Sequence, residues 1–512
     1  MSEKRLIVVN TLANGVAQFA AMLSALVFMP FLVRSFGIGD YGLYLLASSV
    51  VGYAVILDFG VSAAVGKTTA EAAAQGDTDR LGRTISSALA FYTLVGIVVF
   101  SIMAVLAFNT GSLFKVSADG ARLLRNLFLL AGTVSLVAWP SSIAGQVLGG
   151  FQKFTQTARV SVAQTIGTIA VTATVVVLHE GPVVLMAATA AVGIAGSLVN
   201  IVLARRALGR IRVSLSLADV SGMRAIFSFA WAVFVIQICT IILYQQTDRL
   251  VLGIFIGGTA IALYEAAGKF QGFVSQLSSF SVSAVMPMAS HLGAQDRKAA
   301  LTTLFLRGTK YSIALLAPVV VVLLVIARPL LLSWLGPTFA GQALAAQILI
   351  SHQVLTAGVT LGDAMMIGLG RLPRRVPYAI GLALLNLVLS LALVRSLGIL
   401  GVVLGTAIPY FIDYPLHMRL LLKVLEVPPG RWLRETIAPT YPLLLLPLGI
   451  SLWLVSTGLA ASMLGLAAIG ALSVGSYWCA LLLFGFNDIE RAEVRSVADS
   501  ALRRLTGARE HE

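Results

Sequence analysis

Long apolar runs separated by short polar segments dominate this chain. Each run has about 20 residues, the length at which an α-helix crosses the hydrocarbon core of a bilayer. The runs do not alternate apolar and polar residues over about ten positions, so the pattern favours helices over the strands of a membrane barrel. About fourteen spans are expected, near residues 8–33, 41–63, 85–109, 122–148, 160–179, 182–204, 224–247, 259–287, 309–327, 342–369, 376–394, 398–422, 437–457 and 461–485.

Composition and charge support this interpretation. Of the 512 residues, 58% are hydrophobic and 11% are charged, whereas soluble domains are about 25% charged. The net charge of +14 would suggest nucleic acid as the partner of a soluble chain, but Lys and Arg also gather in the cytoplasmic loops of membrane proteins. With both termini in the cytoplasm, the inside segments hold roughly four times as many Lys and Arg residues as the outside segments. We therefore predict an all-α polytopic membrane protein with cytoplasmic termini and no nucleic-acid partner.

One segment partly matches the sequence motif of a nucleotide-binding site. Gly66, Lys67 and Thr68 match the end of a phosphate-binding P-loop, but five residues, not four, separate Gly60 from Gly66, and an apolar run rather than a strand precedes the segment. We interpret this as a chance match. The cysteines and histidines show no metal-ligand spacing either, so no metal and no other cofactor is expected.

An internal repeat organises the spans. When the sequence is shifted by 220 positions, Gly37 meets Gly257 and Tyr44 meets Tyr264, and the spans align as well. Because the offset equals six helices, both halves have the same orientation in the membrane. This predicts a six-helix lobe at 1–204, a basic cytoplasmic linker at 205–223, a second six-helix lobe at 224–425, two extra spans at 426–486 and a cytoplasmic amphipathic tail at 487–512.

Three stretches of the sequence match a known family of membrane proteins. They are "FMPFLVRSFGIGDYGLYLLASSVVGYAVILDFGVSAAVGKTTAE" in the first two helices, "DRLVLGIFIGGTAIALYEAAGKF" at the junction of helices seven and eight, and "LLLSWLGPTFAGQA" before helix ten. These stretches resemble Wzx-type polysaccharide flippases. The family is the polysaccharide-transporter branch of the multidrug/oligosaccharidyl-lipid/polysaccharide exporter superfamily, and the likeness covers most of residues 1–425.

This resemblance implies a two-lobed flippase of about 14 helices. Such proteins move undecaprenyl-diphosphate-linked sugars, such as O-antigen or exopolysaccharide repeat units, from the cytoplasmic to the periplasmic leaflet of the bacterial inner membrane. Membrane lipids are then further partners, together with polysaccharide polymerase and chain-length proteins.

A diphosphate head group needs cations along its path, and Arg suits phosphate because of its planar fork. Charges inside spans cost several kcal/mol unless they face a cavity or a partner. Four such residues belong to helices seven and eight, namely Asp248, Arg249, Glu265 and Lys269. Either Arg249 or Lys269 faces a central cavity and is held by the carboxylates, or the four form a self-neutralising salt-bridge cluster that ties the two helices together.

Other polar residues are weaker candidates for lining the cavity. Asn14 and Gln18 are one turn apart on the first helix, and hydrogen bonding between helices is the alternative role. Arg34 and Arg125 lie at the outer mouth and Lys67 at the inner mouth, where anchoring at the membrane interface by snorkelling is the alternative.

Three carboxylates within spans are candidates for coupling transport to an ion. These are Asp58 in helix two, Asp363 in helix ten and Asp413 in helix twelve. Each could serve instead as a partner for a neighbouring hydroxyl or backbone group.

One other transport role, one enzymatic role and one non-transport role compete with the flippase. A cation-coupled multidrug antiporter typically has an acidic residue in helix one, and the span at 8–33 has none. A polymerase or ligase needs a large periplasmic loop, and the outside loops are short. A non-transport subunit of a polysaccharide assembly complex fits the internal repeat and the charges within spans less well. We therefore expect a transporter and no enzymatic activity.

Overall fold

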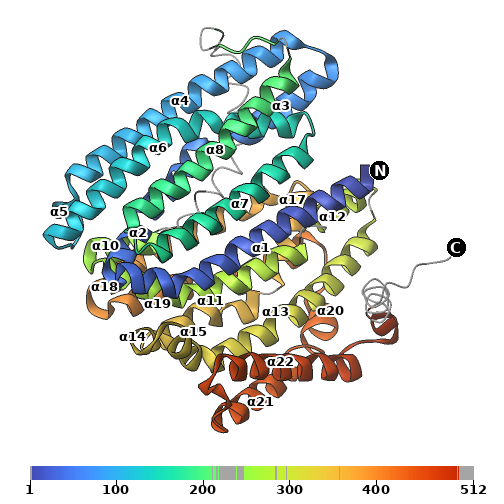
Figure 1. Cartoon of the computed structure of the whole chain (residues 1–512). Helices are drawn as coiled ribbons and strands as arrows, with labels where there is room; N and C mark the ends of the chain where they lie inside the picture. The colour runs from blue at the N-terminus through green and yellow to red at the C-terminus, as the bar shows by residue number, and fades with distance from the viewer. Residues whose placement is uncertain are drawn as a thin grey trace, which may run out of the picture. The chain divides into compact units, whose positions relative to one another are not determined.

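The computed structural model describes residues 3–209, 211–214, 217, 238, 247–282, 285–295, 297–356, 358–492 and 494, with the side chains of residues 3–19, 63, 280–282, 286 and 287 excepted. Within these ranges the regular elements are α-helices and short 3-10 or π turns, as Figure 1 shows. The predicted all-α polytopic fold with roughly 14 helices is confirmed.

The first part of the chain forms mostly long helices, joined by two short ones. They are α1 (Glu3–Phe36), α2 (Ile38–Tyr53), η1 (Ala54–Asp58), α3 (Val61–Gln75), α4 (Thr78–Phe108), α5 (Thr110–Leu113), α6 (Ala118–Gly150), α7 (Phe154–Val177) and α8 (Pro182–Leu208). Of the expected span at 224–247, only residues 238 and 247 are described, and of the predicted linker at 205–223 residues 210, 215, 216 and 218–223 lie outside the described residues.

The second part combines long helices with short pieces. They are α10 (Thr247–Phe255), α11 (Gly258–Val282), α12 (Val285–Ala294), α13 (Lys298–Leu335), α14 (Pro337–Ala340), α15 (Ala343–Ser351), α16 (Gln353–Thr356), α17 (Val359–Gly368), η3 (Leu372–Arg375), α18 (Val376–Leu397), α19 (Ile399–Val424), α20 (Pro429–Trp432), η4 (Leu433–Ile437), η5 (Pro442–Leu444), α21 (Leu445–Ser456), η6 (Leu459–Ala461), α22 (Met463–Ala480) and η7 (Leu481–Gly485). Most of the predicted amphipathic tail lies outside the described residues.

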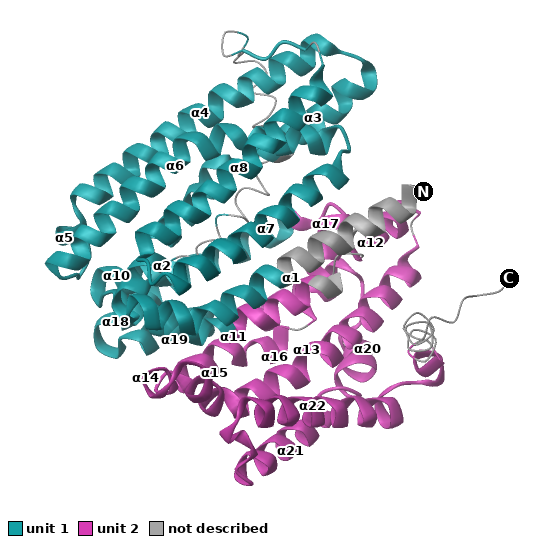
Figure 2. Ribbon diagram, viewed as in Figure 1, with its two compact units in different colours: residues 1–269, 373–409 teal, residues 270–372, 410–512 magenta. Residues whose placement is uncertain are grey.

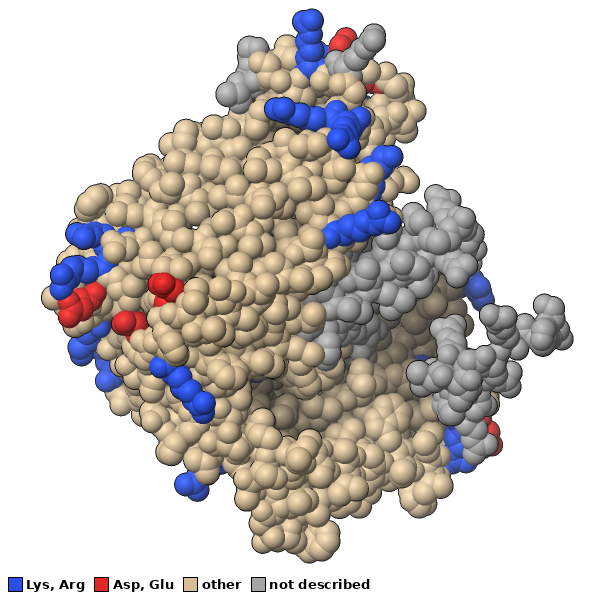
Figure 3. All heavy atoms as spheres, viewed as in Figure 1, with Lys and Arg blue, Asp and Glu red and all other residues tan. Residues whose placement is uncertain are grey.

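The lengths and apolar composition of the helices suit a membrane. In the part of the chain that the structure describes, ten helices are long and apolar enough to cross a bilayer, and a bent pair makes an eleventh if it is counted as one span. On the face drawn in Figure 3, uncharged residues cover most of the surface and the charged side chains form small groups. Large apolar side chains such as Phe108 and Leu464 are exposed, as expected where lipid is the solvent.

The chain divides into two compact units, shown in Figure 2. Unit 1 comprises residues 1–269 and 373–409, and unit 2 comprises residues 270–372 and 410–512. Two of the boundaries therefore fall inside α11 and α19. The division into two six-helix lobes made from the repeat stays a prediction.

In unit 1, glycine allows two helices to approach closely. A Cβ atom on Gly42 in α2 would lie 1.8 Å from the carbonyl oxygen of Gly258, the first residue of α11. A Cβ atom on Gly253 in α10 would likewise lie 2.9 Å from the side chain of Leu46. Because no side chain intervenes, α2 lies directly against the α10–α11 segment, which carries the charged residues singled out above.

The second expected span is not one continuous helix. After α2 and η1, Phe59 takes φ 49° and Gly60 takes φ 74°, and α3 begins at the next residue. Asp58 holds this break, because its carboxylate accepts hydrogen bonds from the Ser62 backbone N–H at 3.3 Å, from the Ser62 hydroxyl at 2.9 Å and from the Tyr92 hydroxyl. A left-handed residue ends the regular hydrogen-bond ladder, and the carboxylate replaces part of it.

Unit 2 is built around the long helix α13. The helices α21 and α22 pack against α13, and α17 packs against both α12 and α13. The expected single span at 342–369 is instead interrupted, because Ala343–Thr356 and Val359–Gly368 meet at an angle of 54°. Glycine at 358 lies against Thr309 of α13, where a Cβ atom would come within 2.3 Å of the Thr309 methyl group.

The close contact between α2 and α11 can be tested by adding one methyl group. Gly42→Ala places a Cβ atom against rigid backbone, so the free energy of unfolding should fall by about 1–3 kcal/mol, seen as a lower Tm of the purified protein in detergent. Gly145→Ala in α6 is the matched control, because nothing lies within 4 Å of its added Cβ atom. Equal Tm values for the two variants would contradict the close packing.

Candidate functional site

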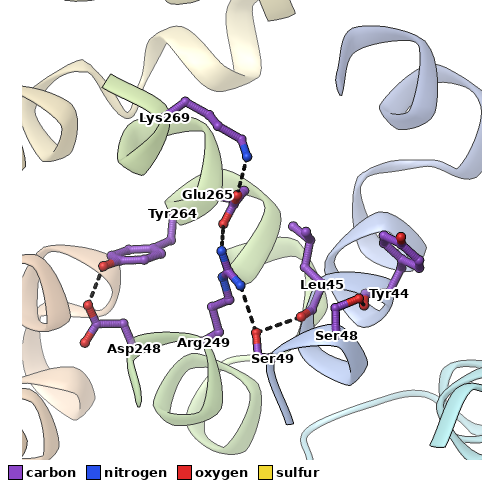
Figure 4. A network of polar contacts seen from close by, with 9 residues as sticks. All are labelled: Tyr44, Leu45, Ser48, Ser49, Asp248, Arg249, Tyr264, Glu265 and Lys269. Carbon is purple, nitrogen blue, oxygen red and sulfur yellow. Dashed lines mark hydrogen bonds and ion pairs between the residues drawn. The ribbon is translucent and has the colours of Figure 1, made fainter. Parts of the chain in front are cut away.

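The charged residues of the predicted site are brought together by a tight turn between α10 and α11. Gly257 joins the two helices with φ 122°, a conformation that favours glycine. A Cβ atom there would also lie 2.8 Å from the carbonyl oxygen of Lys115. The turn folds α11 back beside α10, so that residues 248 and 249 face residues 264 and 265 (Figure 4).

One carboxylate of this site is paired with two cations. Arg249 Nη2 donates to Glu265 Oε2 at 2.6 Å, and Lys269 Nζ lies 2.6 Å from Glu265 Oε1. Glu265 is buried, whereas the side chains of Arg249 and Lys269 are 22% and 24% exposed. Glu265 and Lys269 are four residues apart on α11, so they lie on one face of that helix and form an ion pair.

Helix α2 holds the other edge of the guanidinium. Arg249 Nη1 donates to Ser49 Oγ at 3.1 Å, and Ser49 Oγ donates to the backbone carbonyl of Leu45 at 2.7 Å. Ser49 is fully buried. The planar fork of Arg249 is thus fixed between two helices, with one nitrogen directed at a hydroxyl and one at a carboxylate (Figure 4).

Asp248 belongs to a separate set of hydrogen bonds. Its carboxylate accepts from the hydroxyl of Tyr264 and from Thr406 Oγ1 at 2.9 Å. Asn386 Nδ2 in turn donates to Thr406 Oγ1 at 3.0 Å and to the carbonyl of Gly405 at 3.2 Å. Asp248 therefore links α10 to α11, and through Thr406 to α19 and α18.

Three residues that the sequence pattern did not indicate also belong to this network, namely Tyr264, Thr406 and Asn386. Asn386 and Thr406 are buried polar residues inside apolar spans, and such residues usually have a specific partner. That signal was available, but the sequence did not reveal that the partner is Asp248.

Of the remaining cavity candidates, the three whose side chains are described lie outside the cluster. Arg34 and Arg125 are exposed at the end of α1 and on α6. Lys67 lies on α3, 3.8 Å from Glu71. Asn14 and Gln18 belong to α1, but their side chains lie outside the description.

Two coupling candidates meet in unit 2 around a histidine that the sequence analysis did not select. His417 Nε2 lies 2.8 Å from Asp363 Oδ1, and His417 Nδ1 lies 3.5 Å from Asp413 Oδ2. His417 is 1% exposed. The spacing of Asp413 and His417, four residues apart on α19, could have indicated the pair. Asp58, the third candidate, holds the break after α2 in unit 1. The coupling role of all three stays a prediction.

A metal centre has no counterpart among the side chains that the structure describes: no group of three or more His, Cys, Asp or Glu residues there could hold a metal ion. The charged cluster of unit 1 consists of cations, one shared carboxylate and hydroxyl groups. Such an arrangement can bind an anion and orient it, and it contains no nucleophile paired with a base.

Comparison with known families gives a direct match. The family model described as "Polysaccharide biosynthesis protein" matches residues 7–292, which is more than half of the chain. The chain belongs to the polysaccharide biosynthesis protein family. The resemblance to polysaccharide flippases that its sequence motifs carry is thereby confirmed.

Curated relatives of this family member come from archaea. It is 22% identical over 404 residues to the probable low-salt glycan biosynthesis flippase Agl15 of Haloferax volcanii, a match that covers 78% of this chain and 80% of the relative. It is 23% identical to the probable flippase AglR of the same organism and 27% identical to the uncharacterized membrane protein MJ1068 of Methanocaldococcus jannaschii. The chain spans 40% of the length of each of these two.

Solved structures share the fold at low identity. The lipid II flippase MurJ, in an inward closed conformation, matches with a TM-score of 0.65 at 14% identity, covering 91% of this chain and 98% of that one. An inward-facing multidrug resistance MATE family transporter of the MOP superfamily matches with a TM-score of 0.60 at 14% identity, covering 80% and 99%. The polysaccharide biosynthesis family member therefore has the fold of these transporters.

The hydrogen bonds to Asp248 can be tested through Tyr264 and Thr406. Tyr264→Phe and Thr406→Val each remove a donor to a buried carboxylate, so each should lower the free energy of unfolding by about 1.5–3 kcal/mol, measured by thermal unfolding in detergent. Tyr378→Phe, at a half-exposed position of α18, is the matched control. Because both donors serve one carboxylate, the effects in the double variant should not add. Wild-type unfolding of both single variants would refute the role of Asp248 as a link between helices.

Proposed function

We propose that this protein is a flippase that moves lipid-linked oligosaccharide across a membrane by alternating access. Its family is one of polysaccharide biosynthesis, and two of its relatives carry the names of probable flippases. The single observation that carries the proposal within the chain is the pair Arg249 and Lys269. These two cations flank the buried carboxylate of Glu265, and their side chains are partly exposed.

The arrangement fits a diphosphate head group. Arg donates two parallel hydrogen bonds to phosphate oxygens, and Lys adds a second positive charge. A polar anion cannot cross about 30 Å of hydrocarbon without such groups, because burying an unpaired charge is costly. The reaction changes no covalent bond, which agrees with a site that holds cations and hydroxyls and with a protein that is not an enzyme.

The proposed substrate is a lipid-linked repeat unit, and the proposed membrane is the bacterial inner membrane. The motif resemblance supports an undecaprenyl-diphosphate-linked O-antigen or exopolysaccharide repeat unit, moved across the bacterial inner membrane by a protein with cytoplasmic termini. The named flippase relatives are archaeal, and a polyprenyl carrier of another length would present the same anionic group to Arg249 and Lys269. Polysaccharide polymerase and chain-length proteins are proposed as partners of the same pathway.

Deleting the gene in its native host tests the function. Lipid-linked repeat units should accumulate in the cytoplasmic leaflet, and the surface polysaccharide should be lost. Accumulation is measured by extracting the lipid-linked sugars and by probing their accessibility to a membrane-impermeant reagent. Normal surface polysaccharide together with altered sensitivity to cationic drugs would favour the multidrug antiporter instead.

Substituting the two cations tests the site. Arg249→Gln or Lys269→Gln should lower the export rate by at least about tenfold, since one charge-assisted hydrogen bond contributes about 1.5–3 kcal/mol. Arg122→Gln is the control, because Arg122 lies on the same unit with an exposed side chain paired to Asp119. Membrane levels of all three variants are measured by immunoblotting. Export at the wild-type rate in both cation variants would refute the site.

A further inference from the structure

Glu265 occupies the place that a substrate anion would take. Both of its oxygens are used, one by Arg249 and the other by Lys269, each at 2.6 Å (Figure 4). The carboxylate is buried, and it lies between the guanidinium of Arg249 and the ammonium of Lys269. In this conformation the proposed diphosphate site is therefore already filled by a side chain of the protein.

A second carboxylate of unit 1, Glu71, shows how burial strengthens an ion pair. Glu71 also lies between two cations, 3.8 Å from Lys67 and 3.2 Å from Arg80, but it is 42% exposed. Exposed pairs of this kind contribute about 0–1 kcal/mol because water competes for both partners. At Glu265 water is largely excluded, and removing an anion from two partly buried cations would leave their charges uncompensated.

We propose that Glu265 is an internal counter-anion that competes with the diphosphate of the substrate for Arg249 and Lys269. This inference rests on the proposed function and names how the same site controls binding and release. In the empty site the carboxylate neutralises one of the two positive charges. An arriving head group displaces it from the cations, and the carboxylate takes them back as the head group leaves.

Competition of this kind serves transport in two ways. Cations without a counter-anion would hold the diphosphate tightly at every stage, and tight binding that is not relieved slows release. The carboxylate raises the free energy of the loaded site relative to the empty one. It also discriminates between lipids, because a diphosphate carries more negative charge than a monophosphate and displaces the carboxylate more readily.

The test compares binding of two short lipids to the full chain in detergent. The probes are farnesyl diphosphate and farnesyl monophosphate, and the variants are Glu265→Gln and the control Glu71→Gln. Glu265→Gln should bind farnesyl diphosphate at least about tenfold more tightly than the wild type, equivalent to 1.4 kcal/mol. Its preference for diphosphate over monophosphate should shrink, and its export rate should fall although its affinity rises. Glu71→Gln should bind both lipids like the wild type.

The results separate this inference from the proposed function. If Glu265 only positions the cations, Glu265→Gln will bind farnesyl diphosphate as weakly as the wild type or more weakly, and the counter-anion is refuted while the site stands. If the wild type does not bind farnesyl diphosphate at all, the diphosphate site and the counter-anion both fail. Should Glu265→Gln not fold, Glu265→Asp keeps the charge but shortens the side chain, and affinity that is unchanged or lower than in the wild type refutes the proposal.

Discussion

A charge inside an apolar environment must be paired, and this constraint determines the structure around Arg249. The guanidinium cannot be neutralised by deprotonation, so the fold supplies a carboxylate at 2.6 Å and a hydroxyl at 3.1 Å. Supplying both requires α2, α10 and α11 to meet within a few ångströms. The glycines at 42, 253 and 257 make this possible, because a side chain at any of them would fill the space that the neighbouring backbone or Leu46 occupies.

The same constraint separates the two carboxylates by role. Glu265 accepts from cations that keep some exposure, whereas Asp248 accepts from the hydroxyls of Tyr264 and Thr406 inside the unit. The first arrangement can be rearranged by another anion, because a stronger acceptor can replace the carboxylate at the exposed edges of Arg249 and Lys269. The hydrogen bonds to Asp248 come from donors on α11 and α19, and they fix the position of α10. A partly exposed ion pair thus lies beside a buried set of hydrogen bonds, and under the counter-anion proposal the first exchanges its acceptor while the second keeps the helices in place.

The sequence predicted the spans well and their interruptions poorly. Span length and apolar composition follow from bilayer thickness, so helices cover the expected runs in the described ranges. The break after α2 depends on the left-handed conformation of Phe59. This conformation cannot be predicted from the residue type, because a phenylalanine rarely adopts it. Of the site, the pair Glu265 and Lys269 was predictable from helical spacing, but Asp248 finds Thr406 across 158 positions of sequence. Contacts of that range follow from tertiary packing, which no local pattern encodes.

The proposed repeat gives the charged cluster a further meaning. Under the offset of 220 positions, Leu45 corresponds to Glu265 and Ser49 to Lys269, and Figure 4 shows all four residues in the same small volume. Helices related by a two-fold pseudo-axis meet their counterparts near that axis, so the repeat predicts that such an axis passes close to this cluster. The first repeat contributes a hydroxyl to Arg249 there, and the second contributes every charge. A symmetric duplication would have placed four cations and four carboxylates around one axis, and their mutual repulsion and desolvation would have been costly. Restricting the charges to one repeat leaves a single carboxylate, Glu265, between two cations, and Asp248 is satisfied separately by the hydroxyls of Tyr264 and Thr406.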